Sequence, residues 1–154
     1  MKSVSEQETK KLFLKYKKNL LSEFGNKALY GSQINDICEN LLGGRFKGVY
    51  AIDNVDLNKQ GYCIVNTDKK SGKGEHWISL YITKKNVYYY DSFSRPSKKL
   101  IKLLDDRITK KGLKIIQSDP TDIEQKGFSE VCGVLCISWL LVCKNLGIRN
   151  AMKI

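Results

Sequence analysis

The stretch Val131-Cys-Gly-Val-Leu-Cys-Ile-Ser-Trp-Leu-Leu-Val-Cys143 decides the fold, because it is apolar almost all the way round a helix. A helix without a polar face must be buried on every side, and this run is too short to cross a bilayer. It therefore predicts a central buried helix. Cys132 lies at its N-terminal end, where unpaired amide groups and the helix dipole lower the pKa of a thiol.

Upstream of this helix, the sequence has the period and composition of β-strands. Short runs of β-branched and aromatic residues, each bounded by turn residues, lie at 46–52, 61–66, 76–82, 87–93 and 113–117. The third and fourth runs predict a hairpin that turns at residues 83–86. With the buried helix, these strands predict an α+β fold in which a mixed central β-sheet packs on the helix that carries Cys132.

Three further segments have the spacing of amphipathic helices. The first covers residues 5–23 and begins with a capping box formed by Ser5 and Glu8. The second begins near residue 32 and ends at the glycines 43 and 44, and the third runs from residue 96 or 97 to about residue 111. We expect these helices to flank the core, with the N-terminal ones on its outside.

Length and composition predict a single domain without a metal site. A chain of 154 residues fits one domain, and 42% hydrophobic and 10% aromatic residues argue against a disordered chain. His76 is the only histidine and no CxxC pair occurs, so the sequence gives little support to a zinc site. The five cysteines are an odd number, which favours reduced thiols over a disulfide framework.

The charge balance is strongly basic. The chain has 27 Lys and Arg residues against 16 Asp and Glu residues, a net charge of +11. The scattered lysines fit a solvated surface and fit non-specific attraction to DNA about equally well. No apolar stretch is long enough for a membrane span, and residues 1–18 are too charged for a signal peptide. We therefore expect no membrane association and a reducing compartment.

The groups that thiol hydrolysis needs occur where the predicted fold brings them together. The chemistry needs a cysteine thiolate, a histidine that exchanges a proton and an acid that orients the histidine. His76 begins one strand of the hairpin and Asp91 ends the other, so both can meet at one edge of the sheet. Cys132 begins the buried helix, and Gly133 leaves room for a substrate backbone to approach.

Taken singly, each of these residues also has an ordinary structural interpretation. A cysteine in an apolar helix is commonly a small core residue, as we expect for Cys136 and Cys143. A lone histidine is commonly a surface group or a core group with its hydrogen bonds satisfied, and an aspartate before Ser-Phe-Ser commonly starts a turn. The order of the residues along the chain favours the chemical interpretation.

His76-Trp77, Asp91, Gln125 and Cys132-Gly133 follow one another in an order that resembles adenain, the maturation protease of adenoviruses, and its relatives. This family is grouped with the ubiquitin-like-protein proteases. Its His–acid–Gln–Cys order, the seven-residue interval from the glutamine to the cysteine and the Cys-Gly-x-x-Cys pattern all recur here.

The resemblance extends over most of the chain, roughly residues 29–143. The segments 29–38 and 45–50 are similar to parts of the adenain-like proteases of virophages, polinton-like elements and large DNA viruses. The resemblance implies an adenain-like cysteine protease fold, with a single domain at 1–154 that consists of an N-terminal helical extension at 1–28 and a catalytic core at 29–154.

The resemblance also implies a role for each matching residue. Cys132 would be the nucleophile, His76 the general base and acid, and Asp91 the group that orients the imidazole. Gln125 would donate to the oxyanion together with the backbone N–H of Cys132. The neighbours Trp77 and Gly133 would support the substrate and the oxyanion, with Trp77 packed over the site to exclude water; no metal is implied.

The match departs from adenain at the acid and at the activator. The acid is Asp91, as in other members of the wider group, where adenain has Glu. Residues 76–131 contain no cysteine, which argues against the disulfide-linked peptide that activates adenain. Activation by DNA and non-specific DNA binding remain implied, and no other cofactor is expected.

The function implied is that of a viral or virus-like-element cysteine endopeptidase. It would process capsid or virion precursor proteins at Gly-Gly or Gly-x sites during particle maturation. We expect a monomer in the virion and in the host cytoplasm or virus factory. One alternative is a protease that removes ubiquitin or a ubiquitin-like protein. Another is a basic DNA-binding or capsid-associated structural protein with a vestigial site.

Overall fold

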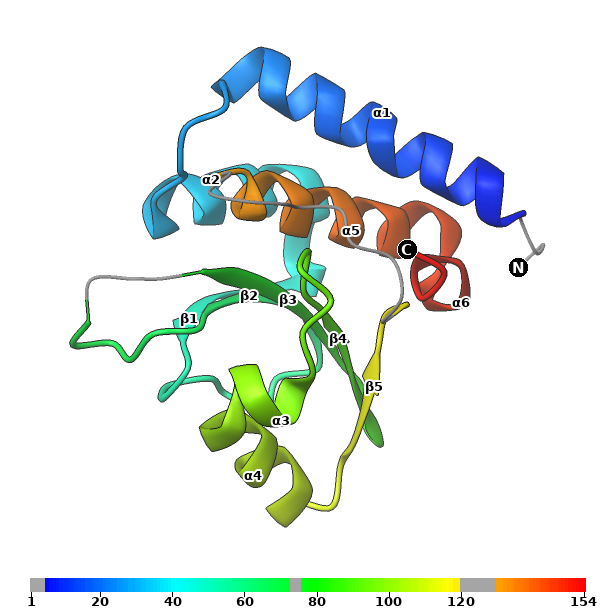
Figure 1. The fold of residues 1–154 in the computed structure, drawn as a ribbon. Helices are drawn as coiled ribbons and strands as arrows, with labels where there is room; N and C mark the ends of the chain where they lie inside the picture. Colours follow the sequence, from blue (N-terminus) through cyan, green and yellow to red (C-terminus); the bar gives the residue numbers. More distant parts are fainter. Residues whose placement is uncertain (1–4, 73–75, 120–129) are drawn as a thin grey trace.

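A mixed five-stranded β-sheet in the order β1-β2-β3-β4-β5 forms the centre of the fold (Figure 1). The structure is a computed structural model that describes residues 5–72, 76–119 and 130–154. Its strands are β1 (Phe46–Ala51), β2 (Gly61–Asn66), β3 (Trp77–Ile82), β4 (Asn86–Tyr90) and β5 (Lys114–Gln117). The three inner strands are antiparallel, and each edge strand is parallel to its neighbour. The predicted α+β class and mixed sheet are therefore confirmed.

The predicted hairpin consists of β3 and β4. At its turn, the Thr83 N–H donates to the Asn86 carbonyl at 2.8 Å, and the Asn86 N–H donates to the Thr83 hydroxyl at 3.0 Å. The strand predicted at 87–93 leaves the sheet earlier, after Tyr90, because residues 91–94 fold back with a hydrogen bond from the Ser94 N–H to the Asp91 carbonyl. His76 and Asp91 thus flank the open end of the hairpin.

Helices cover both faces of this sheet. They are α1 (Glu6–Phe24), α2 (Gly31–Leu42), α3 (Ser97–Leu100), α4 (Lys102–Lys110), α5 (Cys132–Leu146) and α6 (Ile148–Ala151), with a 3₁₀ turn, η1, at Gly43–Arg45. The Ser5 hydroxyl caps α1 by accepting from the Glu8 N–H, which is one of the two bonds of the predicted capping box. As predicted, α2 ends at Gly43, whose φ of 64° suits glycine.

The single helix predicted at 96–111 is wrong in one respect, because it is divided at Ile101. Ile101 has φ −127° and ψ 45°, outside the helical region, and its side chain is fully buried beneath the sheet with Leu104. A hydrogen bond of 2.8 Å from the Ser97 hydroxyl to the Asp105 carboxylate joins the two pieces. Burial of Ile101 together with this side-chain bond favours a bend over a straight helix.

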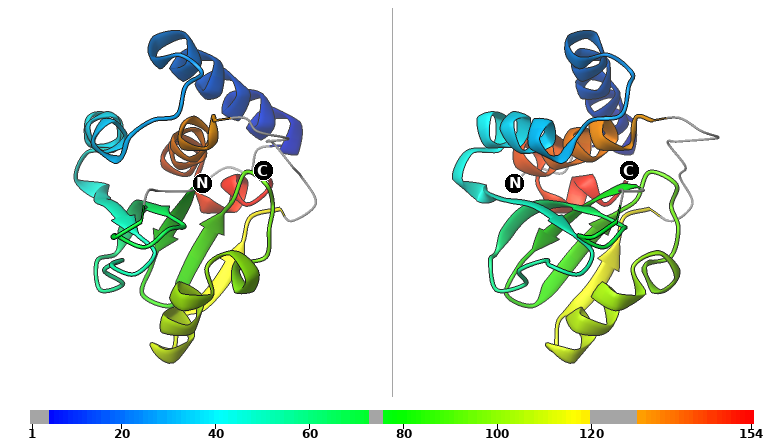
Figure 2. Two further views of the ribbon diagram at one scale, coloured as in Figure 1. Left: turned by 60° about the vertical axis from the view of Figure 1, so that its left-hand side comes forward. Right: turned by 90° about the vertical axis from the view of Figure 1, so that its left-hand side faces the viewer.

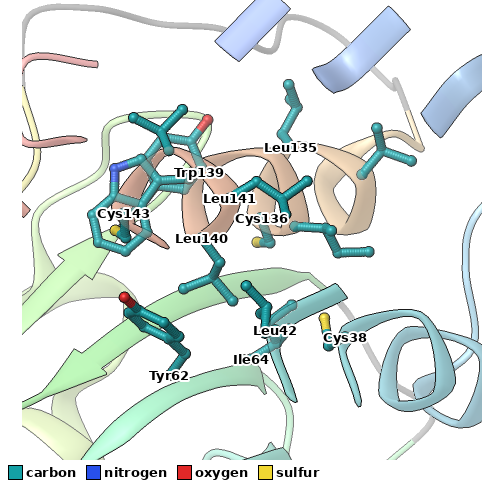
Figure 3. Close-up of a cluster of buried hydrophobic side chains, with 14 of the residues drawn as sticks. Cys38, Leu42, Tyr62, Ile64, Leu135, Cys136, Trp139, Leu140, Leu141 and Cys143 are labelled. Carbon is teal, nitrogen blue, oxygen red and sulfur yellow. The ribbon is translucent and has the colours of Figure 1, made fainter. Parts of the chain in front are cut away.

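The helix α5 lies between the sheet on one side and α1 on the other (Figures 1 and 2). Every residue from Gly133 to Cys143 is buried. Figure 3 shows Cys136 and Leu140 pointing toward Tyr62 and Ile64 of β2. The prediction of a central buried helix flanked by the N-terminal helices is confirmed.

The strand β3 connects the two layers of the core. Ser79 and Tyr81 face α5, where the Ser79 hydroxyl donates to the Cys136 carbonyl at 3.1 Å. The alternate residues Ile78, Leu80 and Ile82 face α3 and α4 in a second cluster of buried side chains. Within the described ranges, no helix combines the length and the apolar character that a membrane crossing requires.

Trp139 offers a test of this packing. It is fully buried, its ring stacks on that of Tyr90 with centroids 5.5 Å apart, and its indole N–H donates to the Ala151 carbonyl at 3.0 Å. We expect Trp139→Ala to lower the free energy of unfolding by about 3–5 kcal/mol, measured by urea denaturation. Leu14→Ala, at an α1 position that is 55% exposed, should change it by less than about 0.5 kcal/mol. Equal effects of the two changes would contradict the central position of α5.

Candidate active site

His76 and Asp91 meet at the open end of the β3–β4 hairpin. The imidazole Nε2 lies 2.6 Å from the Asp91 Oδ1, and both side chains are buried. The His76 carbonyl accepts from the Thr67 N–H at 2.8 Å, which fixes the backbone of the histidine to the segment after β2. The two side chains come together as the hairpin predicts.

The Asp91 carboxylate accepts several further hydrogen bonds. Its Oδ1 also accepts from the Phe93 N–H at 3.2 Å, while its Oδ2 accepts from the Arg95 N–H at 3.0 Å and from the Arg95 Nε–H at 3.1 Å. Burial raises the pKa of Asp91, but the hydrogen bonds from His76 and Arg95 outweigh burial and hold that pKa below its ordinary value. The carboxylate is therefore ionised at neutral pH, and the imidazole Nε2 donates to it.

Cys132 lies on the other side of the imidazole. Its thiol and the His76 ring are close enough for each to shift the pKa of the other, and because Nε2 faces Asp91, Nδ1 is the ring nitrogen that remains for the sulfur. Burial lowers the pKa of His76, but the bonds to Asp91 and Cys132 outweigh it and raise that pKa. The structure thus joins Cys132, His76 and Asp91 in one chain of contacts.

Backbone groups also affect the pKa of the Cys132 thiol. Burial raises its pKa, but the imidazole and the N–H groups of Trp77 and Gly133 outweigh burial, so the pKa is lowered. Cys132 is the first residue of α5, where the helix dipole favours negative charge. The raised pKa of His76 and the lowered pKa of Cys132 both favour an imidazolium–thiolate pair over the neutral imidazole and thiol.

The other cysteines differ from Cys132. Burial raises the pKa of Cys38 and Cys63 to about 12, and it also raises the pKa of Cys136 and Cys143. All four are buried, whereas the residue Cys132 is partly exposed. Cys136 and Cys143 are core residues, as the sequence predicts.

Trp77 and Gly133 pack the first turn of α5 against the start of α2. The Trp77 indole N–H donates to the Leu29 carbonyl at 3.2 Å. A Cβ atom at Gly133 would lie 3.3 Å from Ile34 Cδ1 and 3.5 Å from Trp77 Cδ1, so glycine permits this close approach. The space at Gly133 is thus filled by the protein's own side chains, and its predicted contact with a substrate backbone stays a prediction.

The predicted oxyanion donor, Gln125, lies outside the described residues. The other predicted donor, the Cys132 N–H, belongs to the first turn of α5. In the described ranges, no group of three His, Cys, Asp or Glu side chains gathers in a way that could hold a metal ion.

The sequence interpretation missed Phe93 and Arg95. The centroid of the Phe93 ring lies 5.2 Å from the centroid of the His76 ring and 4.8 Å from the guanidinium carbon of Arg95. One signal was present in the sequence: Arg95 is one of only four arginines in a lysine-rich chain, and it follows Asp91 by four residues.

This arrangement has the chemical groups for acyl transfer. A thiolate can attack a carbonyl carbon, and the imidazolium beside it can donate its proton to the leaving group. An ionised carboxylate on the far ring nitrogen fixes the tautomer and stabilises the imidazolium. No protein-family model matches the chain, and a search of curated proteins finds no match to its sequence.

The lowered pKa of Cys132 predicts selective alkylation. Iodoacetamide reacts with thiolates, and the thiolate fraction rises as the pH increases through the pKa. We expect Cys132 to be alkylated first in the folded protein, with a midpoint below that of a free cysteine, as followed by mass spectrometry. In His76→Ala the midpoint should move to higher pH, because the imidazole no longer stabilises the thiolate.

The control for this experiment is Cys132→Ser, which keeps the four buried cysteines. It should incorporate little reagent until the protein unfolds. A wild-type midpoint equal to that of free cysteine would contradict the described surroundings of Cys132.

Proposed function

We propose that this protein is a cysteine endopeptidase in which Cys132 is the nucleophile and His76 and Asp91 are its partners. The single observation that supports this function best is the chain of contacts from Asp91 through His76 to a partly exposed cysteine at the start of α5. A buried ion pair that served stability alone would not need a thiol of lowered pKa at its end.

The proposed reaction begins with the imidazolium–thiolate pair. The Cys132 sulfur attacks the scissile carbonyl carbon, and the carbonyl oxygen takes the negative charge near the Cys132 N–H and the predicted donor Gln125. When the tetrahedral intermediate collapses, the C–N bond breaks and His76 gives its proton to the leaving amine. A water molecule then gives a proton to His76 and adds to the thioester carbonyl carbon; the C–S bond breaks, the carboxyl product leaves and the imidazolium–thiolate pair is restored.

The proposed substrates are capsid or virion precursor proteins, cleaved at Gly-Gly or Gly-x sequences. The resemblance of residues 29–143 to adenain-like proteases supports this substrate class. The setting of Cys132 is compatible with it, because the cysteine is only partly exposed and Trp77 lies beside it. A glycine-containing backbone would approach such a nucleophile with less obstruction than one with large side chains.

Co-expression with the capsid proteins of its own genome tests this function. We expect the wild-type protein to shorten a capsid precursor. Cys132→Ala and His76→Ala should abolish the processing, because loss of the nucleophile or base costs a factor of about 10⁴ or more. The fragments are identified by mass spectrometry of their new termini, which should follow a glycine-containing sequence.

Cys143→Ala is the matched control, because it removes a buried thiol from the far end of the same helix. It should process the precursor at close to the wild-type rate. Processing that survives in both Cys132→Ala and His76→Ala would overturn the enzymatic proposal. Reaction of Cys132 with a ubiquitin-type probe, without capsid processing, would assign the site to a ubiquitin-like-protein protease instead.

Gln125 allows nucleophile activation to be separated from oxyanion stabilisation. Loss of one oxyanion donor lowers kcat by about 10²- to 10³-fold in other acyl-transfer enzymes. We therefore expect Gln125→Ala to lower the cleavage rate to this extent and to leave the alkylation rate of Cys132 unchanged. Gln60→Ala, at an exposed position, is the control. A Gln125→Ala protein that cleaves at the wild-type rate would contradict the role carried over from the resemblance.

A further inference from the structure

The segment from Asp91 to Arg95 forms a tight loop around the Asp91 carboxylate. The Ser94 N–H closes the loop on the Asp91 carbonyl at 2.8 Å, and Ser94 has φ 55°, a left-handed conformation that is uncommon for a residue other than glycine. Both the backbone N–H and the Nε–H of Arg95 then donate to Asp91 Oδ2. The loop therefore returns to the carboxylate at its starting point.

Two neighbouring strands fix the backbone of Arg95. Its carbonyl accepts from the Tyr89 hydroxyl and from the Gln117 Nε2 amide, both at 3.1 Å. Tyr89 lies on β4 and Gln117 on β5, so the arginine is anchored to the sheet that positions the hairpin. The guanidinium also lies over the Phe93 ring, which contacts the His76 ring.

We propose that Arg95 is a positioning residue for the site, which holds the Asp91 carboxylate with its Oδ1 directed at His76; the proposal rests on the peptidase function proposed above. A carboxylate can rotate about its Cβ–Cγ bond. Two donors from Arg95 on Oδ2 oppose that rotation, while Oδ1 accepts from His76 and from the Phe93 N–H. Arg95 thus acts on the imidazole through Asp91.

Arginine suits this task better than lysine. The Nε–H is part of a rigid planar group, so its hydrogen bond to Oδ2 has a fixed direction. The Arg95 side chain is 44% exposed, so water screens its charge, whereas the carboxylate that it holds has no exposed surface. The directional bond, more than the charge, is therefore what Arg95 supplies.

The lone histidine makes this role measurable without any substrate. His76 gives the only imidazole signals in an NMR spectrum of the chain, so its titration and its tautomer can be assigned directly. The titratable groups that act on the imidazole are Asp91 and the Cys132 thiol. The substitution Cys132→Ala in the full chain removes the thiol, whose titration is coupled to that of His76. This variant is the background for every further substitution.

Adding Arg95→Ala to this background should lower the pKa of His76 and reduce the fraction of neutral imidazole protonated on Nε2, because the Asp91 acceptor is less well directed. Arg95→Lys should restore only part of both effects. A His76 pKa that does not change in Arg95→Ala would overturn the proposal. A His76 pKa that rises in Arg95→Ala and returns fully in Arg95→Lys would also overturn it, because that result indicates a simple effect of the charge. Arg107→Ala on α4, which removes a hydrogen bond to the Val55 carbonyl, is the control and should leave His76 unchanged.

With Cys132 intact, Arg95→Ala should lower kcat about tenfold on the capsid precursor and leave KM nearly unchanged, because one charge-assisted hydrogen bond to a group remote from the substrate is lost. If no precursor is cleaved by any variant but the NMR shifts occur, the positioning role stands and the proposed function fails. If the wild type cleaves and Arg95→Ala changes neither kcat nor the His76 signals, the function stands and the positioning role is wrong.

Discussion

The complete burial of α5 is the constraint on which the other layers depend. Because this helix is apolar on all sides, it is stable only where the sheet covers one side and α1 and α2 cover the other. Its few polar groups find partners inside the protein. The Ser138 hydroxyl donates to the Val134 carbonyl at 2.8 Å, and the Trp139 indole reaches Ala151 on α6. The backbone of the short helix α6 thus provides the hydrogen-bond acceptor for a core side chain.

One buried hydrogen bond also fixes the position of the β3–β4 hairpin along α5. The Ser79 hydroxyl on β3 donates to the Cys136 carbonyl. His76 precedes Ser79 by three residues, and Cys132 precedes Cys136 by one helical turn, so this contact brings imidazole and thiol to the same end of the layer. The geometry of the candidate site therefore follows from the packing of the core, and no separate element is needed to bring the two groups together.

The sequence predicts the parts of this structure that depend on local period. Apolar spacing identifies the strands and the buried helix, and the hairpin connection places His76 beside Asp91. The bend at Ile101 depends on burial beneath the sheet, and the position of Arg95 depends on bonds to Tyr89 and Gln117 from two different strands. The sheet that covers Ile101 and the Gln117 side chain, 22 residues from Arg95, lie outside a short window of sequence, and the bond from Tyr89 depends on the fold of the loop between the two residues. Periodicity therefore could not predict these contacts.

The Asp91 loop is difficult to explain by stability alone. A buried carboxylate loses hydration, and well-packed apolar residues often replace a buried ion pair without loss of stability. Here the charge is retained, the loop includes the left-handed Ser94, and the pair ends at a partly exposed thiol. Strained backbone and buried charge commonly occur together where a side chain must be held in one orientation for chemistry. Their combination beside Cys132 favours a catalytic explanation of the site over a purely structural one.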